Sequence, residues 1–200
     1  MKKVLLLVCT LLFGIPALAQ SFTPADREKG VQYLEQTRDG VVAAVKGLSD
    51  AQMKFKLAPD RWSVAETLEH IALAENDAHN LFAQAMKSPA GSPDLDFAKV
   101  DAMILAMVPD RSHKAQAPEM LRPTGRWATE AELTKVFEES RKANMDYIRT
   151  TSDDLRDHFF SHPVFGPMDG YQWLLLLSAH SGRHTEQIEE VKADPNFPKE

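Results

Sequence analysis

Cysteine is almost absent from this chain of 200 residues, which contains only Cys9. If the segment around Cys9 is removed, the remaining chain can form no disulfide, can offer no thiolate to a metal ion and has no cysteine nucleophile. A run of basic residues is also lacking, which argues against nucleic acid or an anionic lipid surface as the partner. The expected partner is a small-molecule substrate, and a homodimer is one option for an oligomeric state that the sequence leaves open.

Long hydrophobic runs are missing as well. The apolar run from Val4 to Ile15 is too short to span a bilayer, so we expect no stable membrane anchor. It follows the basic Met-Lys-Lys start and precedes a small-x-small site at Ala17-Leu18-Ala19, which is typical of a secretory signal. These features predict a cleaved signal peptide, residues 1–19, and a mature domain, residues 20–200, that is periplasmic or secreted.

Two alternatives for the N-terminus are an uncleaved anchor and a lipoprotein site at Cys9. Val8 is not the small residue that a lipoprotein signal usually has before its cysteine, and Cys9 lies inside the apolar run. Cleavage would remove two lysines and no acid, so the formal net charge would change from −6 to −8. The mature domain is therefore acidic, and its length is sufficient for one well-filled core.

Helix start signals dominate the rest of the chain. A residue with a capping side chain is followed three positions later by an acid or a glutamine, as in a capping box. The four starts are Thr23-Pro24-Ala25-Asp26, Ser63-Val64-Ala65-Glu66, Thr129-Glu130-Ala131-Glu132 and Asp169-Gly170-Tyr171-Gln172. The first helix is expected to run to about Leu48, and the others to end near Lys87, before Asp153 and before Pro195. No sustained strand-like alternation occurs, so the sequence predicts an all-α four-helix bundle.

A long, proline-rich connection, residues 87–128, joins the second and third predicted helices. Phe97, Val100, Ile104 and Met107 recur within it at helical spacing, which predicts a short extra helix. A connection of this length in a compact domain is usually functional or disordered, and here it could shape the mouth of a pocket.

Two histidines one turn apart lie on the hydrophobic face of the last predicted helix. At 100° per residue, His180 and His184 share a stripe with Trp173, Leu177 and Val191. A buried imidazole needs a partner for its nitrogens, and histidines at i and i+4 can bind one metal ion together. The spacing alone is a weak signal, because hydrogen bonds could satisfy both rings instead.

The leading candidate for a third ligand is His70, which lies beside an apolar flank of the second predicted helix. His79 falls on the opposite side of that helix and is expected to be solvated. His158 and His162 fall in a predicted loop, where a surface or turn role is the simpler expectation, and His113 cannot be placed within the long connection.

Two motifs together resemble the DinB/YfiT-like superfamily of four-helix-bundle metalloenzymes. They are Trp62-Ser63-x-x-Glu66-x-Leu68-x-His70 and His180-x-x-x-His184-x-x-Gln187, and the likeness extends from APDRWS to QIEEVKADPNFP. The resemblance implies a site in which His70, His180 and His184 bind a divalent metal ion such as zinc or nickel. Similar proteins include transferases that use a low-molecular-weight thiol, a thiol-dependent isomerase and many proteins without an assigned activity.

Further polar residues are candidates for roles near such a site. Gln187 and Glu66 could orient the histidine ligands, although Glu66 is also explained by its capping box with Ser63. Asp77 is the one acid that we can suggest as a proton acceptor, on the same side of the helix as His70. An anionic substrate could be held by arginines that would otherwise be surface charges, namely Arg122, Arg126 and Arg183.

Three interpretations follow from these patterns. The first is an exported metal-dependent hydrolase or thiol S-transferase, in which the metal ion activates water or a thiol. The second is a non-catalytic metal-binding or small-ligand-binding bundle of the cell envelope. The third is a bundle whose histidines are only hydrogen-bonded, and the combination of both motifs disfavours it.

Overall fold

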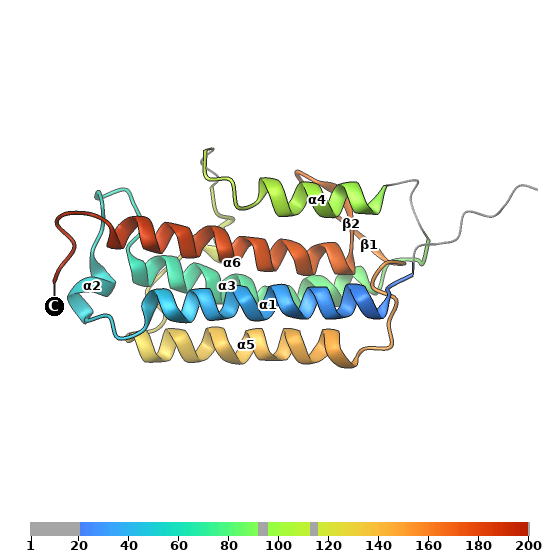
Figure 1. Cartoon of the computed structure of the whole chain (residues 1–200), viewed down its shortest axis with the longest axis horizontal. Helices are drawn as coiled ribbons and strands as arrows, with labels where there is room; N and C mark the ends of the chain where they lie inside the picture. The colour runs from blue at the N-terminus through green and yellow to red at the C-terminus, as the bar shows by residue number, and fades with distance from the viewer. Residues whose placement is uncertain (1–20, 92–95, 113–115, 200) are drawn as a thin grey trace, which may run out of the picture.

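In a computed structural model of the chain, which describes residues 21–91, 96–112 and 116–199, four long helices lie side by side (Figure 1). They are α1 (Pro24–Val45), α3 (Val64–Ala85), α5 (Glu130–Thr150) and α6 (Gly170–Lys192). Shorter helical elements are α2 (Asp50–Lys54), α4 (Phe97–Met107) and the 3-10 turn η1 (Glu119–Leu121). The predicted four-helix bundle with an extra helix in the long connection is confirmed. The predicted signal peptide, residues 1–19, and His113 lie outside the described residues.

The long helices begin at the predicted caps. The side chains of Thr23, Ser63, Thr129 and Asp169 each accept a hydrogen bond from the backbone N–H three residues later. These bonds satisfy donors that have no partner inside the helix. The first helix ends at Val45, a little before the predicted Leu48, because the chain leaves the helical conformation and Gly47 adopts a φ of +73°.

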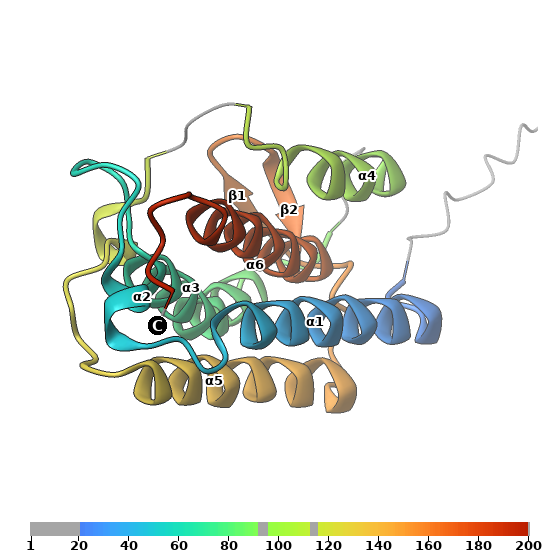
Figure 2. The same cartoon turned by 60° about the vertical axis from the view of Figure 1, so that its left-hand side comes forward.

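Helix direction explains why the connection between α3 and α5 is long. The colour gradient shows that α1 and α6 run one way and α3 and α5 the other (Figures 1 and 2). The neighbours in the bundle are α1 with α6, α3 with α5, α3 with α6, and α1 with α5. Because α3 and α5 are parallel neighbours, the chain must return along the whole bundle, about 30 Å for a helix of this length. The α4 helix lies on this return path and packs against α6.

A short β-hairpin stands where the sequence predicts a loop. Strands β1 (Phe159–His162) and β2 (Gly166–Asp169) pair antiparallel, with Phe159 opposite Asp169 and His162 opposite Gly166. Strands of four residues are too short to show a sustained alternation, so the pattern gave no warning of them. The turn role expected for His162 is found in the structure, because its Nδ1 accepts hydrogen bonds from the backbone N–H groups of Val164 and Phe165. The Nδ1 of His158 instead lies 2.7 Å from the carbonyl oxygen of Ser88, three residues beyond the end of α3.

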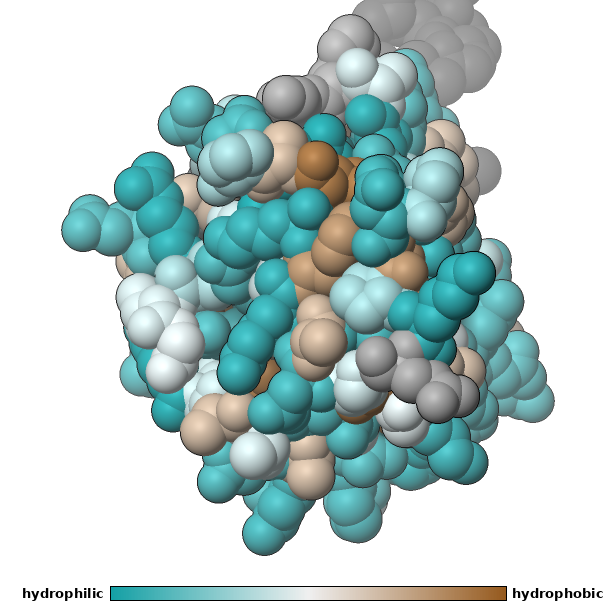
Figure 3. All heavy atoms as spheres, turned by 90° about the vertical axis from the view of Figure 1, so that its left-hand side faces the viewer, coloured by the Kyte–Doolittle hydropathy of each residue, from teal (hydrophilic) through white to brown (hydrophobic). Residues whose placement is uncertain are grey.

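The core has two hydrophobic clusters among the described residues, and a polar layer separates them. On α3 one cluster ends at Ala72 and the other begins at Ala78, with the buried Glu75 between them. Arg141 of α5 forms a fully buried ion pair with Glu75 and donates hydrogen bonds to the carbonyl of Leu34 and to Ser181 Oγ. This layer therefore links all four long helices. None of the helices in the described part is both long and apolar enough to cross a membrane. The end face of the bundle on the left of Figure 1 is mostly hydrophilic, with a few hydrophobic residues between the polar ones (Figure 3).

Candidate metal centre

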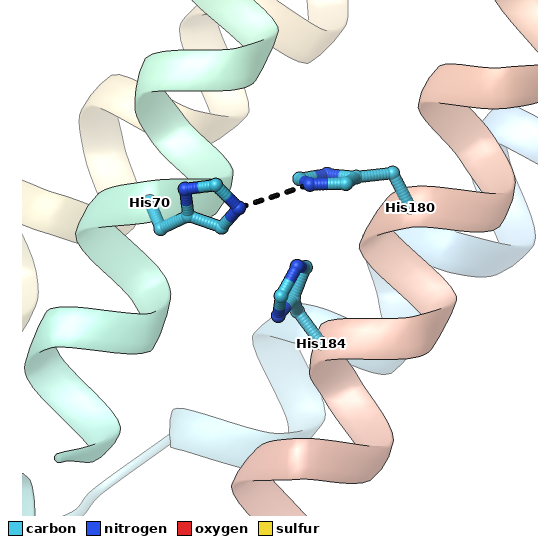
Figure 4. Close-up of side chains that lie close together, drawn as sticks. All are labelled: His70, His180 and His184. Carbon is cyan, nitrogen blue, oxygen red and sulfur yellow. Dashed lines mark hydrogen bonds between the residues drawn. The ribbon is translucent and has the colours of Figure 1, made fainter. Parts of the chain in front are cut away.

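Three histidines from two helices converge beside this polar layer. His70 lies in the second turn of α3, and His180 and His184 lie one turn apart on α6 (Figure 4). The helical register that was inferred from the sequence explains the α6 pair, because residues four apart project in one direction. The packing of α3 against α6 then brings His70 opposite them, with ring centroids 4.8 Å from His180 and 4.6 Å from His184.

The outer nitrogens of two rings are held so that their inner nitrogens face a common centre. His70 Nδ1 donates to the carbonyl of Leu121 at 2.7 Å, and His184 Nδ1 donates to Gln187 Oε1 at 2.9 Å. A carbonyl oxygen can only accept, so the proton lies on Nδ1 and Nε2 keeps its lone pair. Figure 4 shows ring nitrogens of all three side chains turned toward one another, and His70 Nε2 lies 3.0 Å from His180 Nε2.

The protein environment keeps these rings neutral. Burial lowers the pKa of His70, and burial together with the neighbouring histidines lowers the pKa of His180 well below its ordinary value. Burial, followed by the charge of His70, lowers the pKa of His184 to about 3. Neutral imidazole is the form that binds a metal ion.

The geometry fits a divalent metal ion. Ligand atoms of the three histidines all lie within 4.8 Å of one another. A tetrahedral ion with bonds of about 2.0–2.1 Å requires nitrogens about 3.4 Å apart, which lies between the 3.0 Å from His70 Nε2 to His180 Nε2 and the 4.8 Å limit of the group. His180 Nε2 faces this centre, and its Nδ1 is buried without a hydrogen-bond partner among the described residues. No fourth His, Asp or Glu joins the group within the described residues.

The other predicted site residues are only partly brought to this centre. Gln187 contacts His184 as described, and Arg111 also donates to its Oε1 at 3.4 Å. Both carboxylate oxygens of Glu66 are used elsewhere, by the backbone N–H of Ser63 and by Lys56 Nζ, each at 2.8 Å. Asp77 is half-buried about 10 Å farther along α3 than His70 and is not in the cluster.

The arginines proposed to hold an anion bond the backbone or side chains of the long connection. Arg122 donates to the carbonyl of Ala117, Arg126 to Thr124 Oγ1, and Arg183 to the carbonyls of Val108 and Asp110. The structure therefore assigns them contacts within the fold. The side chain of His79 lies outside what the structure describes, so its predicted exposure stays a prediction.

Two residues near the centre were missed or left without a role by the sequence. Trp62 stacks obliquely on His70, with ring centroids 4.8 Å apart, and its ring lies 6.4 Å from that of His184. Glu69, beside His70 on α3, is 3% exposed and accepts hydrogen bonds from three backbone N–H groups of the long connection. The only sequence signal for Glu69 was an acid next to a proposed ligand, in a helix where acids usually face water.

A comparison with known protein families identifies the family of this chain. The family model of the DinB superfamily matches residues 33–188, which include all three histidines. The chain belongs to the DinB superfamily. Among curated relatives of this DinB-superfamily chain, the uncharacterized protein YuaE of Bacillus subtilis is 24% identical over 148 residues, which cover 74% of this chain and 88% of YuaE.

Two solved structures share the fold. One is YfiT from Bacillus subtilis, described as a probable metal-dependent hydrolase with an unusual four-helix bundle topology. It aligns with a TM-score of 0.59 and 17% identity, covering 86% of the DinB-superfamily chain and 89% of YfiT. The four-helix bundle protein TT2238 aligns with a TM-score of 0.52 and 15% identity, covering 82% and 98% of the two chains. At these identities the likeness establishes the fold alone.

Proposed function

We propose that this DinB-superfamily protein is an exported metal-dependent enzyme in which His70, His180 and His184 hold one divalent ion, zinc or nickel. The observation that carries the proposal is the orientation of the rings. Leu121 and Gln187 hold the outer nitrogens of two histidines, so that inner lone pairs from α3 and α6 point to one place. In metal sites, histidine ligands almost always donate their other N–H to such an acceptor.

Three neutral ligands leave a coordination position open, which is the pattern of catalytic rather than structural zinc sites. When bound, the ion would act as a Lewis acid and lower the pKa of a water molecule or a thiol, so that either becomes a nucleophile near neutral pH. The chain's own residues orient the ligands, and Trp62 places an apolar surface beside His70 and His184. An apolar surface near the centre strengthens electrostatic interactions there, because it excludes water.

Hydrolysis is the reaction that we favour, since the structural neighbour YfiT is described as a probable metal-dependent hydrolase. A thiol S-transferase would use the same open coordination position, with a thiol in place of water as the nucleophile. Export is proposed from the basic start, the apolar run and the small-x-small site before Gln20. The substrate is proposed to be a small molecule.

The first test is the metal content of the mature, untagged protein by elemental mass spectrometry. Wild type and His162→Ala should each hold about one ion per chain, and His180→Ala should hold almost none. His162 is a matched control because its ring lies in the hairpin turn. Negligible metal in all three proteins after incubation with zinc and nickel would refute the proposal.

Activity assays with the metal-loaded protein then distinguish hydrolysis from thiol transfer. Ester and amide substrates test whether water is the nucleophile, and an electrophile supplied with a low-molecular-weight thiol tests transfer. Loss of either activity in His180→Ala would assign it to this centre. An ion that raises stability greatly but accepts no imidazole or azide would instead support the non-catalytic, structural role.

A further inference from the structure

Glu69 is a buried carboxylate whose partners are backbone groups. Its Oε1 accepts hydrogen bonds from the N–H groups of Thr124 and Arg126 at 2.9 and 3.2 Å, and its Oε2 accepts from Gly125 at 2.8 Å. No ion pair of Glu69 is found in the described part of the chain. Three successive N–H groups that point at one anion form a nest, and Gly125 permits it with a φ of +75°.

The same segment also contacts the neighbouring residue on α3. Leu121, whose carbonyl accepts from His70 Nδ1, is only three residues before Thr124. Pro123 lies between them, and its ring fixes φ and removes one freedom of the link. Two consecutive residues of α3, Glu69 and His70, therefore hold two nearby points of one short segment.

We propose that Glu69 is a positioning residue of the metal centre. By fixing the backbone of Thr124–Arg126, it keeps the carbonyl of Leu121 over His70 Nδ1. That carbonyl sets the tautomer and the orientation in which His70 presents Nε2 to His180 and His184. The inference rests on the proposed function only where it concerns metal affinity, because the effect on the ring of His70 holds in the metal-free protein.

Replacing Glu69 with Gln should release the segment at little steric cost. An amide has one oxygen in place of two and brings an NH₂ group against a backbone N–H, so the nest cannot be satisfied. Loss of an outer partner typically weakens metal binding by 10–100-fold. Because Glu69 acts through Leu121, we expect the lower end of this range, about tenfold weaker zinc binding.

The matched control is Glu66→Gln, one turn earlier on the same helix. Glu66 also accepts from a backbone N–H, that of Ser63, but it does not contact the segment. Both variants should unfold at a lower temperature than wild type. Only Glu69→Gln should weaken zinc in competition with a chromophoric chelator.

The second readout is the ring ¹⁵N spectrum of His70 in the metal-free protein. Wild type and Glu66→Gln should show the tautomer with the proton on Nδ1, whereas Glu69→Gln should show a mixture. Equal zinc affinity and an unchanged tautomer in Glu69→Gln would overturn the inference. If Glu69→Gln does not fold, Gly125→Ala tests the same nest from an exposed position, where a side chain is strained at the observed φ, and the same change in tautomer is expected.

The two proposals fail in different ways. Wild type that binds no zinc would sink the proposed function, yet the tautomer of His70 would still decide whether Glu69 positions it. If wild type binds zinc, and Glu69→Gln binds it equally tightly with the same tautomer of His70, only the positioning role of Glu69 is refuted.

Discussion

Acidification should destabilise the metal-free protein through His184. The folded state holds this imidazole neutral, with a pKa lowered to about 3 by burial and by His70. In the unfolded chain its pKa is about 6.5. Well above pH 6.5 this imidazole is neutral in both states, so it makes no contribution to the pH dependence of the unfolding free energy. Below pH 6.5 the imidazole of His184 becomes protonated in the unfolded chain but stays neutral in the folded protein.

The size of the effect follows from proton linkage. Stability contributed by a group with a depressed pKa is present above its unfolded pKa and is lost as the pH falls toward its folded pKa. The loss is about 1.4 kcal/mol per pH unit within that window. Between pH 7.5 and 5.0 a folded pKa near 3 corresponds to about 2 kcal/mol of lost unfolding free energy. His184 is 8% exposed, so solvent screening reduces this figure little.

Urea unfolding of wild type and His184→Asn, with a chelator present at both pH values, measures the term. Wild type should lose about 2 kcal/mol more than the variant between pH 7.5 and 5.0. Groups that His184 does not affect titrate alike in both proteins and cancel, including Asp169, whose pKa burial raises to about 6 and which acts in the opposite direction. The charge of His184 also contributes to the lowered pKa of His180, so His184→Asn relieves part of that shift as well. Equal losses in the two proteins would refute the reasoning that His184 is held neutral.

Three further outcomes are expected. Arg141→Ala leaves Glu75 buried and unpaired, so it should cost about 3–5 kcal/mol in urea unfolding, whereas an effect below about 1 kcal/mol would contradict the role given to this pair. Gly30→Ala places a Cβ 2.8 Å from Ile148 Cδ1 while Gly40→Ala meets only ordinary contacts, so the first should be less stable than the second by about 1–3 kcal/mol, and the reverse order in thermal unfolding would refute it. In urea unfolding, zinc at about 100 times its Kd should add about 2.7 kcal/mol to the free energy of unfolding of wild type and nothing to that of His180→Ala.

Features that depend on neighbouring residues were predictable from the sequence. The caps at Thr23, Ser63, Thr129 and Asp169 were found because a cap and its partner are three residues apart. The pairing of His180 with His184 was found because the helical period alone places them on one face. His70 joined them in the hypothesis through its apolar flank and the family resemblance, and only the packing of α3 against α6 supplies the distance.

Features that depend on backbone partners or on helix order were not predictable. Glu69 accepts hydrogen bonds from main-chain N–H groups 55 to 57 residues away. Because almost every residue has a main-chain N–H, the sequence does not show which of them will face Glu69. The parallel pairing of α3 with α5 is a property of the bundle as a whole. Acids in helices usually face water, yet Glu69 and Glu75 are buried. Their burial is possible because each carboxylate has hydrogen-bond or ion-pair partners inside the protein.

The placement of ligands on both α3 and α6 has a consequence for maturation. His70 and His180 are 110 positions apart, so the complete centre cannot exist until the last helix has packed. An unfolded chain offers only histidines that are close in sequence, such as His180 with His184, and such a pair is a weak competitor for metal. Loading would therefore follow folding. For a chain that we propose is exported, the metal supply of the compartment in which it folds would select the ion.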